Sequence, residues 1–259
     1  MLCPHDSLRR WLVIGAILAV DCPRPCRCLL KADEPKATTK QLAKQNTAIV
    51  PVPRKSKRGW MKVHASLNEK AKQGDVDLVF LGDSITEGWN DAGKDVWAKF
   101  YGARKALNLG ISGDRTQHVL WRLDNGNIAG IQPKLAVVMI GTNNYSDNTA
   151  EEIAAGIKAT VEKLRAKLPE TKVLLLGIFP RDDKRNETRD KFAQVNQTIA
   201  KLDDQKFVYF LDIGPKFLLP DGSLSKEAMP DLLHPEAKGF EIWAEAIEPQ
   251  VVKLLGEKK

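Results

Sequence analysis

The stretch DLVFLGDSITEG at residues 77–88 joins a short apolar run to a glycine, an aspartate and a serine. The run does not alternate with polar residues, which is typical of a strand buried on both faces of a parallel sheet. Ser84 follows that strand, where the next helix is expected to begin. Backbone N–H groups there favour negative charge, so a nucleophile that passes through an oxyanion fits the position. Ser84 alone is equally consistent with an ordinary helix N-cap.

Four more apolar runs follow along the chain, and helical patterns separate them. The clearest helix begins with a capping box formed by Thr149 and Glu152 and ends before Pro169. Such alternation predicts an α/β protein, a three-layer α/β/α sandwich around a five-stranded parallel sheet. The expected strands are residues 77–82, 106–110, 135–141, 172–179 and 206–213, and the expected helices are residues 60–73, 116–123, 150–168, 186–202 and 238–255.

A base for Ser84 is present near the other end of the chain. A serine hydroxyl needs one, because its own pKa is too high, and histidine oriented by a carboxylate is the usual choice. The motif DLLHP places Asp231 and His234 three residues apart, so one turn can bring the carboxylate beside the imidazole. The other histidines, His5, His64 and His118, fall in the leader, an opening helix and an apolar helical stripe, where structural roles are expected.

Two glycine-containing turns follow the second and third strands. Gly113 lies in GISGD, where glycine lets the backbone approach a ligand, and Asn143 lies in GTNN, where its amide can donate to a developing oxyanion. Each could be only a tight turn. Ligands of parallel sheets gather beyond the carboxyl ends of the strands, and both turns lie at that edge, together with Ser84.

These four blocks together resemble the SGNH (GDSL) hydrolase family, over about residues 60–256. The resemblance implies a sheet of flavodoxin-like type and a catalytic triad of Ser84, Asp231 and His234. It also implies an oxyanion hole made by the N–H groups of Ser84 and Gly113 and the side chain of Asn143. It implies no cofactor and no metal.

Longer stretches resemble one branch of that family, the catalytic subunits of platelet-activating-factor acetylhydrolase Ib. They are NLGISGDRTQHVLWRLDNGNI at 108–128, VVMIGTNN at 137–144 and LLLGIFPR at 174–181. The resemblance implies a serine esterase that cleaves a short-chain ester, most simply an acetyl ester, through an acyl-enzyme. Acetylesterases that act on sugars share the pattern, so a small-molecule, carbohydrate or lipid ester stays open as substrate.

Two other functions compete with the esterase, and two further classes of protein are disfavoured. The same triad would serve an acetyl transferase to a sugar, and a catalytically silent relative would bind carbohydrate or lipid. The α/β-hydrolase class is disfavoured, because its nucleophile motif reads G-x-S-x-G and Thr86 occupies the last glycine position here. No dinucleotide or P-loop motif is found in the sequence.

The net charge of +7 does not indicate nucleic-acid binding. Residues 1–58 carry twelve Lys or Arg against four Asp or Glu, so the rest of the chain is close to neutral. A nucleic-acid footprint should lie on the folded domain, and this charge does not. The four cysteines all lie within the first 28 residues, which excludes a disulfide framework or a cysteine-bound metal in the domain.

The chain divides into three expected parts. Residues 1–32 contain Arg9-Arg10 and a ten-residue apolar run at 11–20, a signal-peptide pattern too short to span a membrane. Residues 33–58 are expected to be a basic flexible linker, and residues 59–259 the hydrolase domain. We therefore expect a secreted or periplasmic protein without a stable membrane span, with a cytoplasmic location as the alternative. A homodimer stays open.

Overall fold

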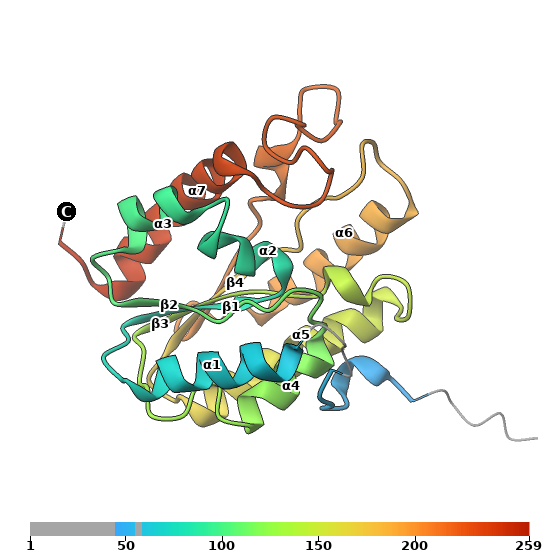
Figure 1. Ribbon diagram of the computed structural model, residues 1–259. Helices are drawn as coiled ribbons and strands as arrows, with labels where there is room; N and C mark the ends of the chain where they lie inside the picture. Colours follow the sequence, from blue (N-terminus) through green and yellow to red (C-terminus); the bar gives the residue numbers. More distant parts are fainter. Residues whose placement is uncertain (1–44, 55–58, 259) are drawn as a thin grey trace, which may run out of the picture. The chain divides into compact units, whose positions relative to one another are not determined.

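The computed structural model describes residues 45–54 and 59–258. Their centre is a five-stranded sheet in the order β2-β1-β3-β4-β5, with every neighbouring pair parallel (Figure 1). This confirms the predicted α/β class with a parallel sheet. The strands are β1 (Leu78–Gly82), β2 (Ala106–Asn108), β3 (Leu135–Met139), β4 (Lys172–Leu176) and β5 (Val208–Leu211).

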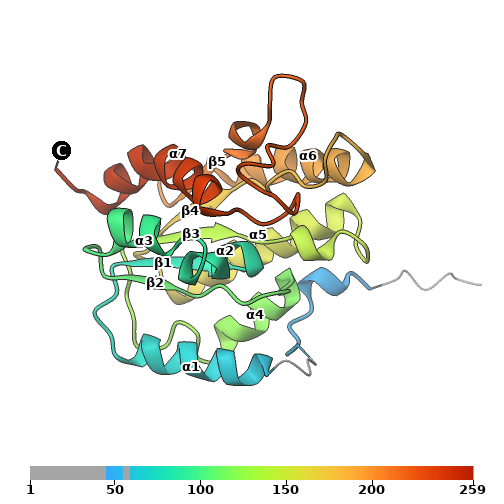
Figure 2. The same ribbon diagram turned by 45° about the horizontal axis from the view of Figure 1, so that its top comes forward.

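Helices cover both faces of the sheet, which gives the predicted three layers (Figures 1 and 2). One face carries α1 (Trp60–Lys72), α4 (Thr116–Asp124), α5 (Ala150–Lys167) and α6 (Glu187–Ile199). The other carries α3 (Lys94–Tyr101) and α7 (Ala237–Leu255). The short helices are α2 (Ser84–Glu87), η1 (Thr47–Ile49), η2 (Gly88–Asn90), η3 (Thr142–Asn144), η4 (Ala200–Leu202) and η5 (Gly214–Phe217).

The unbroken apolar runs are explained by the two cores that the sheet separates. Val79 and Leu81 point into the core beneath α1, α4 and α5, whereas Leu78 and Phe80 point into the core beneath α3 and α7. Every residue of β1 and of β3 is buried. Each fully buried side chain of this size stabilises the fold by roughly 1.5–3 kcal/mol, so alternate residues of one strand hold both layers.

The second core is unusually rich in aromatic rings. Phe80 contacts Trp97 and Tyr101, with ring centroids 5.0 and 4.8 Å away in edge-on and tilted arrangements, and those two rings contact each other. Trp89 contacts Trp243 at 5.1 Å, which joins η2 to α7. Aromatic pairs with this geometry add to the stabilisation given by burial alone. The cluster therefore fixes α3 and α7 against β1, the strand that precedes Ser84.

Several element boundaries differ from those expected. All five strands are shorter: β2, β3, β4 and β5 end two or three residues early, where the chain turns into loops at the carboxyl edge, whereas β1 and β5 begin one and two residues late. The helix expected at 186–202 ends as α6 at Ile199 and continues as the 3-10 helix η4. A helix begins at Ser84 as expected, but α2 ends after four residues, and α3 was not expected, since no clear helical period marks residues 84–101.

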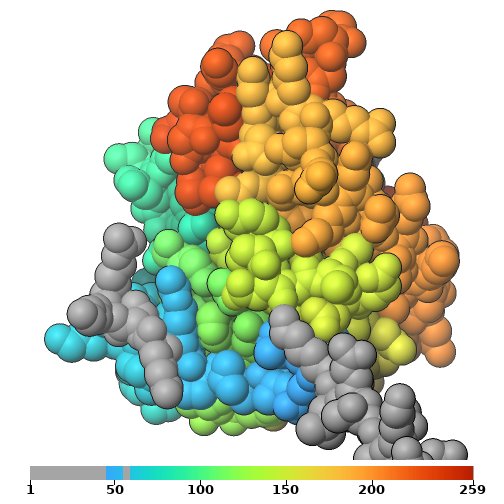
Figure 3. Space-filling model, turned by 90° about the vertical axis from the view of Figure 1, so that its right-hand side faces the viewer, coloured from blue at the N-terminus to red at the C-terminus, as the bar shows by residue number. Residues whose placement is uncertain are grey.

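The flexible-linker prediction for residues 33–58 is wrong for residues 45–54. Ala48 in η1 is fully buried, and its carbonyl accepts a hydrogen bond of 2.7 Å from Oγ1 of Thr116. Val52 N–H donates to the Gln117 carbonyl at 3.3 Å. This segment lies beside α4 and α5 (Figure 3). It is held by hydrogen bonds and one small buried residue, which leaves no apolar period in the sequence.

The predicted signal peptide at residues 1–32, and its cleavage, lie outside the described residues. Within the described part of the chain, no helix is both long enough and apolar enough to cross a bilayer.

Candidate active site

Ser84 lies where β1 gives way to α2, as the sequence predicted. The preceding residue, Asp83, is the N-cap, and its Oδ1 accepts a hydrogen bond of 3.1 Å from the Ile85 N–H. Ser84 is therefore not the N-cap itself. Helix α2 has only four residues, so its dipole is small, and the local N–H groups are what can stabilise negative charge here.

The structure brings together the three residues of the predicted triad. Oγ of Ser84 lies 3.0 Å from Nε2 of His234, although 150 positions separate them in the sequence. Nδ1 of His234 lies 2.6 Å from Oδ2 of Asp231. The two contacts use opposite nitrogens of one imidazole ring, so the three side chains form a continuous line.

The DLLH turn is held by the Asp231 carboxylate. Oδ1 of Asp231 accepts hydrogen bonds from the N–H groups of Leu233, at 3.0 Å, and His234, at 2.7 Å. Leu232 has a positive φ of 63°, an uncommon conformation for a branched residue. Its carbonyl accepts a bond of 2.9 Å from the Asp182 N–H, which compensates for the strain. Both carboxylate oxygens of Asp231 are thus occupied, one by the backbone and one by the ring.

These contacts define the proton positions. Partial burial raises the pKa of Asp231, but hydrogen bonds from the His234 ring and from the backbone of His234 and Leu233 outweigh it, so that its pKa is lowered overall. An ionised carboxylate only accepts hydrogen bonds, so Nδ1 of His234 must carry the proton. Nε2 is then free to accept the hydrogen of the Ser84 hydroxyl, which is the tautomer a general base needs.

Gly113 and Asn143 lie in neighbouring turns beside Ser84. Gly113 has a φ of 73°, in the left-handed region that favours glycine. Nδ2 of Asn143 donates to the Asp114 carbonyl at 2.9 Å, which ties the two turns together and leaves its second hydrogen available. Among the described residues, the N–H groups of Ser84 and Gly113 have no hydrogen-bond acceptor. The arrangement thus presents three donors at one edge of the sheet.

A buried ion pair supports the Gly113 turn from below. Asp114 and Arg122 are both fully buried, and Oδ2 of Asp114 lies 2.8 Å from Nε of Arg122. Oδ1 of Asp114 accepts from Nε1 of Trp60 at 2.6 Å. Arg122 also donates to the carbonyls of Gly82, at 3.2 Å, and Leu109, at 2.7 Å. It therefore joins the ends of β1 and β2 to the turn, a role that its place within a helical stretch did not reveal.

Burial strongly affects the two acids of this region. Burial raises the pKa of Asp83 to about 7; the Ile85 N–H opposes that rise and the nearby Asp114 adds to it. Oδ2 of Asp83 has no hydrogen-bond partner among the described residues. Burial also raises the pKa of Asp114, to about 6, against the opposing effects of Arg122, Trp60 and Arg54. A negative charge on Asp83 is therefore costly in the folded protein.

Asp83→Asn is expected to stabilise the protein near neutral pH and above. The unfolded carboxyl loses its proton near pH 4 and the folded one near pH 7. Stability of the wild type should therefore fall as pH rises through this window, by on the order of a few kcal/mol. The asparagine side chain keeps an oxygen for the Ile85 N–H and never ionises. Urea unfolding at about pH 4, 6 and 8 measures the free energy of unfolding. The variant should exceed the wild type in this quantity only at the two higher pH values.

The exposed Asp91→Asn variant serves as the control and should not change this pH dependence. If the free energy of unfolding depended on pH equally in the wild type and in Asp83→Asn, ionisation of Asp83 would not destabilise the folded protein, contrary to the prediction.

The other described histidines have structural contacts. Nδ1 of His118 accepts from the Arg115 N–H at 3.0 Å at the start of α4. Its pKa is lowered to about 4, first by burial and then by the charges of Arg54, Arg115 and Arg122. His64 stacks on Trp60 with ring centroids 5.6 Å apart. His5 lies outside the described residues.

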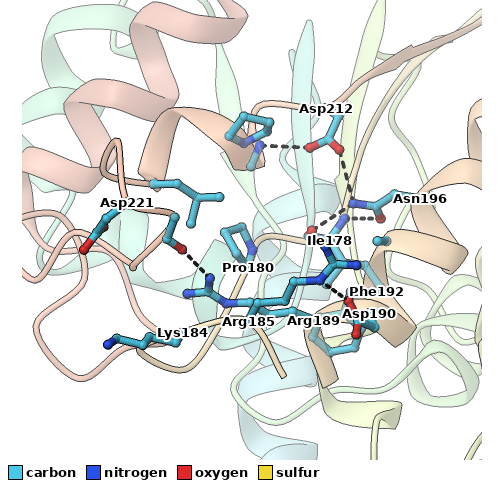
Figure 4. Close-up of a pocket in the computed structure, with 15 residues that line it drawn as sticks. Ile178, Pro180, Lys184, Arg185, Arg189, Asp190, Phe192, Asn196, Asp212 and Asp221 are labelled. Carbon is cyan, nitrogen blue, oxygen red and sulfur yellow. Dashed lines mark hydrogen bonds and ion pairs between the residues drawn. The ribbon is translucent and has the colours of Figure 1, made fainter. Parts of the chain in front are cut away.

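A loop between β4 and α6 supports the DLLH turn, and Arg189 holds it. The guanidinium of Arg189 donates to the carbonyls of Arg181, Asp182, Asp183 and Gly222 at 2.6–3.0 Å. Arg189 also lines a cavity of about 610 Å³ with a partly apolar floor (Figure 4). Ser84, Asp231 and His234 do not line this cavity, so it is separate from the triad.

Two further arginines at the site were not identified from the sequence. Arg181 stacks on the ring of Tyr145, with 4.5 Å between Cζ and the ring centroid. Arg54, from the segment at 45–54, donates to the Ser112 carbonyl. Tyr145 stands two residues after Asn143, so its ring could have been identified from the sequence as a neighbour of the site. Arg54 belongs to a short run of basic residues and carried no distinguishing signal.

Within the described residues, no group of three or more His, Cys, Asp or Glu side chains is arranged to hold a metal ion.

Residues 80–242 match the model of the GDSL-like lipase/acylhydrolase family. The chain belongs to this family. This GDSL-like chain is 36% identical over 217 residues to platelet-activating factor acetylhydrolase IB subunit alpha1 of Homo sapiens, covering 82% of this chain and 93% of the relative. It is 38% identical over 199 residues to subunit alpha2 of the same enzyme from Rattus norvegicus, covering 76% of this chain and 86% of that relative. The family and these relatives make it an ester-cleaving hydrolase.

Solved structures agree on the fold of this GDSL-like enzyme. A GDSL-like lipase from Bacteroides thetaiotaomicron matches with a TM-score of 0.61 at 22% identity, covering 74% of this chain and 97% of that one. An acetylxylan esterase from Geobacillus stearothermophilus matches with a TM-score of 0.53 at 20% identity, covering 71% of this chain and 96% of that one. At these identities the likeness concerns the fold alone, and it agrees with the sandwich described above.

Proposed function

We propose that the enzyme hydrolyses short-chain esters, principally acetyl esters, through an acyl-enzyme on Ser84. One observation carries the proposal: the continuous contact from the Asp231 carboxylate through His234 to the Ser84 hydroxyl, at 2.6 and 3.0 Å. A serine becomes an effective nucleophile when an adjacent base, oriented by a third group, can take its proton. The geometry supports these roles for the three residues.

In the first half-reaction, Oγ of Ser84 bonds to the ester carbonyl carbon while its proton passes to Nε2 of His234. The carbonyl becomes an oxyanion, which accepts hydrogen bonds from the N–H groups of Ser84 and Gly113 and from Nδ2 of Asn143. Asp231 stabilises the imidazolium. The carbonyl then re-forms, the bond to the alcohol oxygen breaks, and His234 delivers the proton to that oxygen.

In the second half-reaction, a water molecule attacks the acyl carbon and gives its proton to His234. The tetrahedral intermediate collapses, the bond to Oγ of Ser84 breaks, and Oγ takes the proton back. One water is consumed, and one carboxylic acid and one alcohol are released. Every step uses groups of this chain and that single water molecule.

The acetyl preference rests on the relatives. The curated proteins that match most of this chain are named acetylhydrolases, and a protein of the same fold is named an acetylxylan esterase. Those names leave open whether the alcohol part here is a lipid, a saccharide or another small alcohol.

A series of 4-nitrophenyl esters from acetyl to dodecanoyl tests the proposal. We expect kcat/KM to be highest for acetyl and to fall by about tenfold or more by octanoyl, because a pocket for two carbons must rearrange for eight. Liberated nitrophenolate gives the rate directly. A preference for octanoyl or longer esters would overturn the acetyl assignment.

Two added measurements separate the rival functions. Transfer of acetyl to an added sugar, faster than to water, would identify a transferase. Failure of a fluorophosphonate probe to label Ser84 would indicate a binding protein without the chemistry.

Export is proposed on the sequence alone. Arg9-Arg10 and the apolar run at 11–20 form a signal-peptide pattern, in residues outside the described part of the chain.

A further inference from the structure

An arginine from the N-terminal segment lies beside the proposed oxyanion hole. The segment at 45–54 is anchored on α4 through the Thr116 and Val52 hydrogen bonds, and next to α5 through a bond of 3.0 Å from Asn148 to Thr47. At its end, Nη1 of Arg54 donates to the Ser112 carbonyl. Because the segment is anchored both on α4 and next to α5, the backbone from which Arg54 reaches the Ser112–Gly113 turn is held in place.

The Arg54 guanidinium occupies the space that a side chain at position 113 would fill. A Cβ added to Gly113 would lie only 2.4–2.6 Å from the Arg54 Nη1, Nη2 and Cζ atoms. Glycine at 113 therefore allows both the left-handed turn and the close approach of a cation. The positive charge lies next to the N–H group that is proposed to bind the oxyanion.

A second arginine lies by the turn that carries Asn143, which the Asn143 side chain joins to the Gly113 turn through the Asp114 carbonyl. Arg181 is stacked on Tyr145, two residues from Asn143, and the next N–H along, that of Asp182, binds the Leu232 carbonyl beside His234. The Arg181 side chain is 17% exposed, and its nearest carboxylate is that of Asp182, 3.9 Å from Nε. Arg181 thus lies between the loop that carries Asn143 and the loop that carries His234.

The acids near these arginines have other partners. Asp114 is paired with Arg122 and Trp60, Asp231 with His234, and Asp182 accepts from Nδ2 of Asn186 at 2.8 Å. Glu87 accepts from the Ser112 N–H at 2.9 Å, and its charge and that of Asp182, 3.9 Å from Arg181, oppose an incoming anion. Within the same part of the chain, Arg54 donates only to the Ser112 carbonyl, so further donors of its guanidinium can serve a ligand.

We propose that Arg54 and Arg181 form an anion subsite that selects esters whose alcohol part carries a carboxylate, sulfate or phosphate. Planar guanidinium groups bind such oxyanions through paired, charge-assisted hydrogen bonds. An acetyl group carries no charge, so the anion belongs to the alcohol part. This inference rests on the proposed esterase function and adds a substrate class and two specificity-determining residues to it.

Matched substrate pairs test the subsite. One pair is a mono-O-acetylated methyl glucuronide and the glucoside acetylated at the same position; the other is acetylglycerol with and without a phosphate. In the wild type we expect kcat/KM to favour the anionic member of at least one pair by about tenfold, because one charge-assisted contact supplies that much. The preference should shrink in about 0.5 M NaCl. The pair that responds identifies the source of the anion.

The variants locate the effect. Arg54→Gln and Arg181→Gln should each lower the anionic-to-neutral ratio by roughly five- to tenfold, and Arg54→Lys should lower it less, because lysine keeps the charge without the paired donors. Lys158→Ala removes one charge from an exposed position of α5 and should leave the ratio unchanged. Thermal melting checks that each variant is folded. A purely structural Arg54 would change stability or overall rate without changing this ratio.

Hydrolysis of 4-nitrophenyl acetate distinguishes a failure of the proposed subsite from a failure of the proposed esterase function. If the wild type cleaves it but shows a ratio near one for both pairs, or if the ratio survives in Arg54→Gln and Arg181→Gln, the anion subsite is wrong and the esterase stands. If no ester is cleaved, the proposed function fails and the subsite fails with it.

Discussion

Replacing Ser84 with alanine is expected to lower kcat for 4-nitrophenyl acetate by about five orders of magnitude. The variant removes the atom that bonds to the acyl carbon, so no acyl-enzyme can form. The remaining donors can still polarise the carbonyl toward attack by water, which leaves a small residual rate. Ser84 is half-buried and not the N-cap of α2, so the loss of its hydroxyl should change the melting temperature little.

The matched control is Ser66→Ala, at an exposed position of α1 on one outer layer of the fold. It should keep the wild-type rate and react with the fluorophosphonate probe, whereas Ser84→Ala should not react. A rate for Ser84→Ala within tenfold of the wild type would remove Ser84 from the mechanism.

Asp231→Asn is expected to lower kcat by about four orders of magnitude, with KM nearly unchanged. Asparagine keeps an oxygen that can accept from the N–H groups of Leu233 and His234, so the turn should persist. Its Nδ2, however, would point hydrogens at Nδ1 of His234. The ring must then carry its own proton on Nε2, where it can no longer accept the hydrogen of Ser84. The wrong tautomer, rather than a disrupted site, causes the loss.

Asp221→Asn is a close structural control for this change. Oδ1 of Asp221 accepts from the Ser223 N–H at 2.9 Å, the same local pattern as in the DLLH turn, but no histidine is attached to it. Its kcat should stay within about twofold of the wild type, as expected for a surface change away from the chemistry. If Asp231→Asn retained a tenth of the wild-type rate, Ser84 and His234 would act as a dyad, and the carboxylate would hold only the turn.

The buried ion pair has consequences for stability rather than for chemistry. Truncating one partner of such a pair leaves a buried charge without compensation, which is strongly destabilising. Because Arg122 also binds the carbonyls of Gly82 and Leu109, it couples the fold to the position of Ser84 and of the Gly113 turn. Variants at this pair are therefore expected to change the free energy of unfolding and the rate together.

Much of the fold could be predicted because its signals are local. The runs that became β1 and β3 lack polar alternation since both of their faces are covered, and that requirement is visible in five consecutive residues. The capping box at Thr149 and Glu152 formed as expected, with bonds of 3.2 and 3.1 Å. Boundaries were less accurate, because the turns at the carboxyl edge depend on contacts between loops.

In the candidate site too, the contacts made within one short turn could be predicted, whereas most contacts between distant segments could not. Asp231 and His234 are three residues apart, so the carboxylate and the ring meet through one local turn, and the sequence alone indicated their pairing. Its placement against Ser84 was expected from the resemblance to the SGNH family, which implies that the three residues form a triad. The catalytic roles themselves stay predictions until the variants are measured.

What the sequence by itself determined was the α/β layering, the position of Ser84 after the first strand and the identity of its partners, because burial and short-range hydrogen bonding leave periodic or closely spaced marks. What only the tertiary structure decided was which distant charges surround them. Arg54 reaches the Ser112 carbonyl across 58 positions, and Arg122 reaches Gly82 across 40. A lone arginine looks the same in sequence whether solvated or buried, since its partner is chosen by how strands and helices pack.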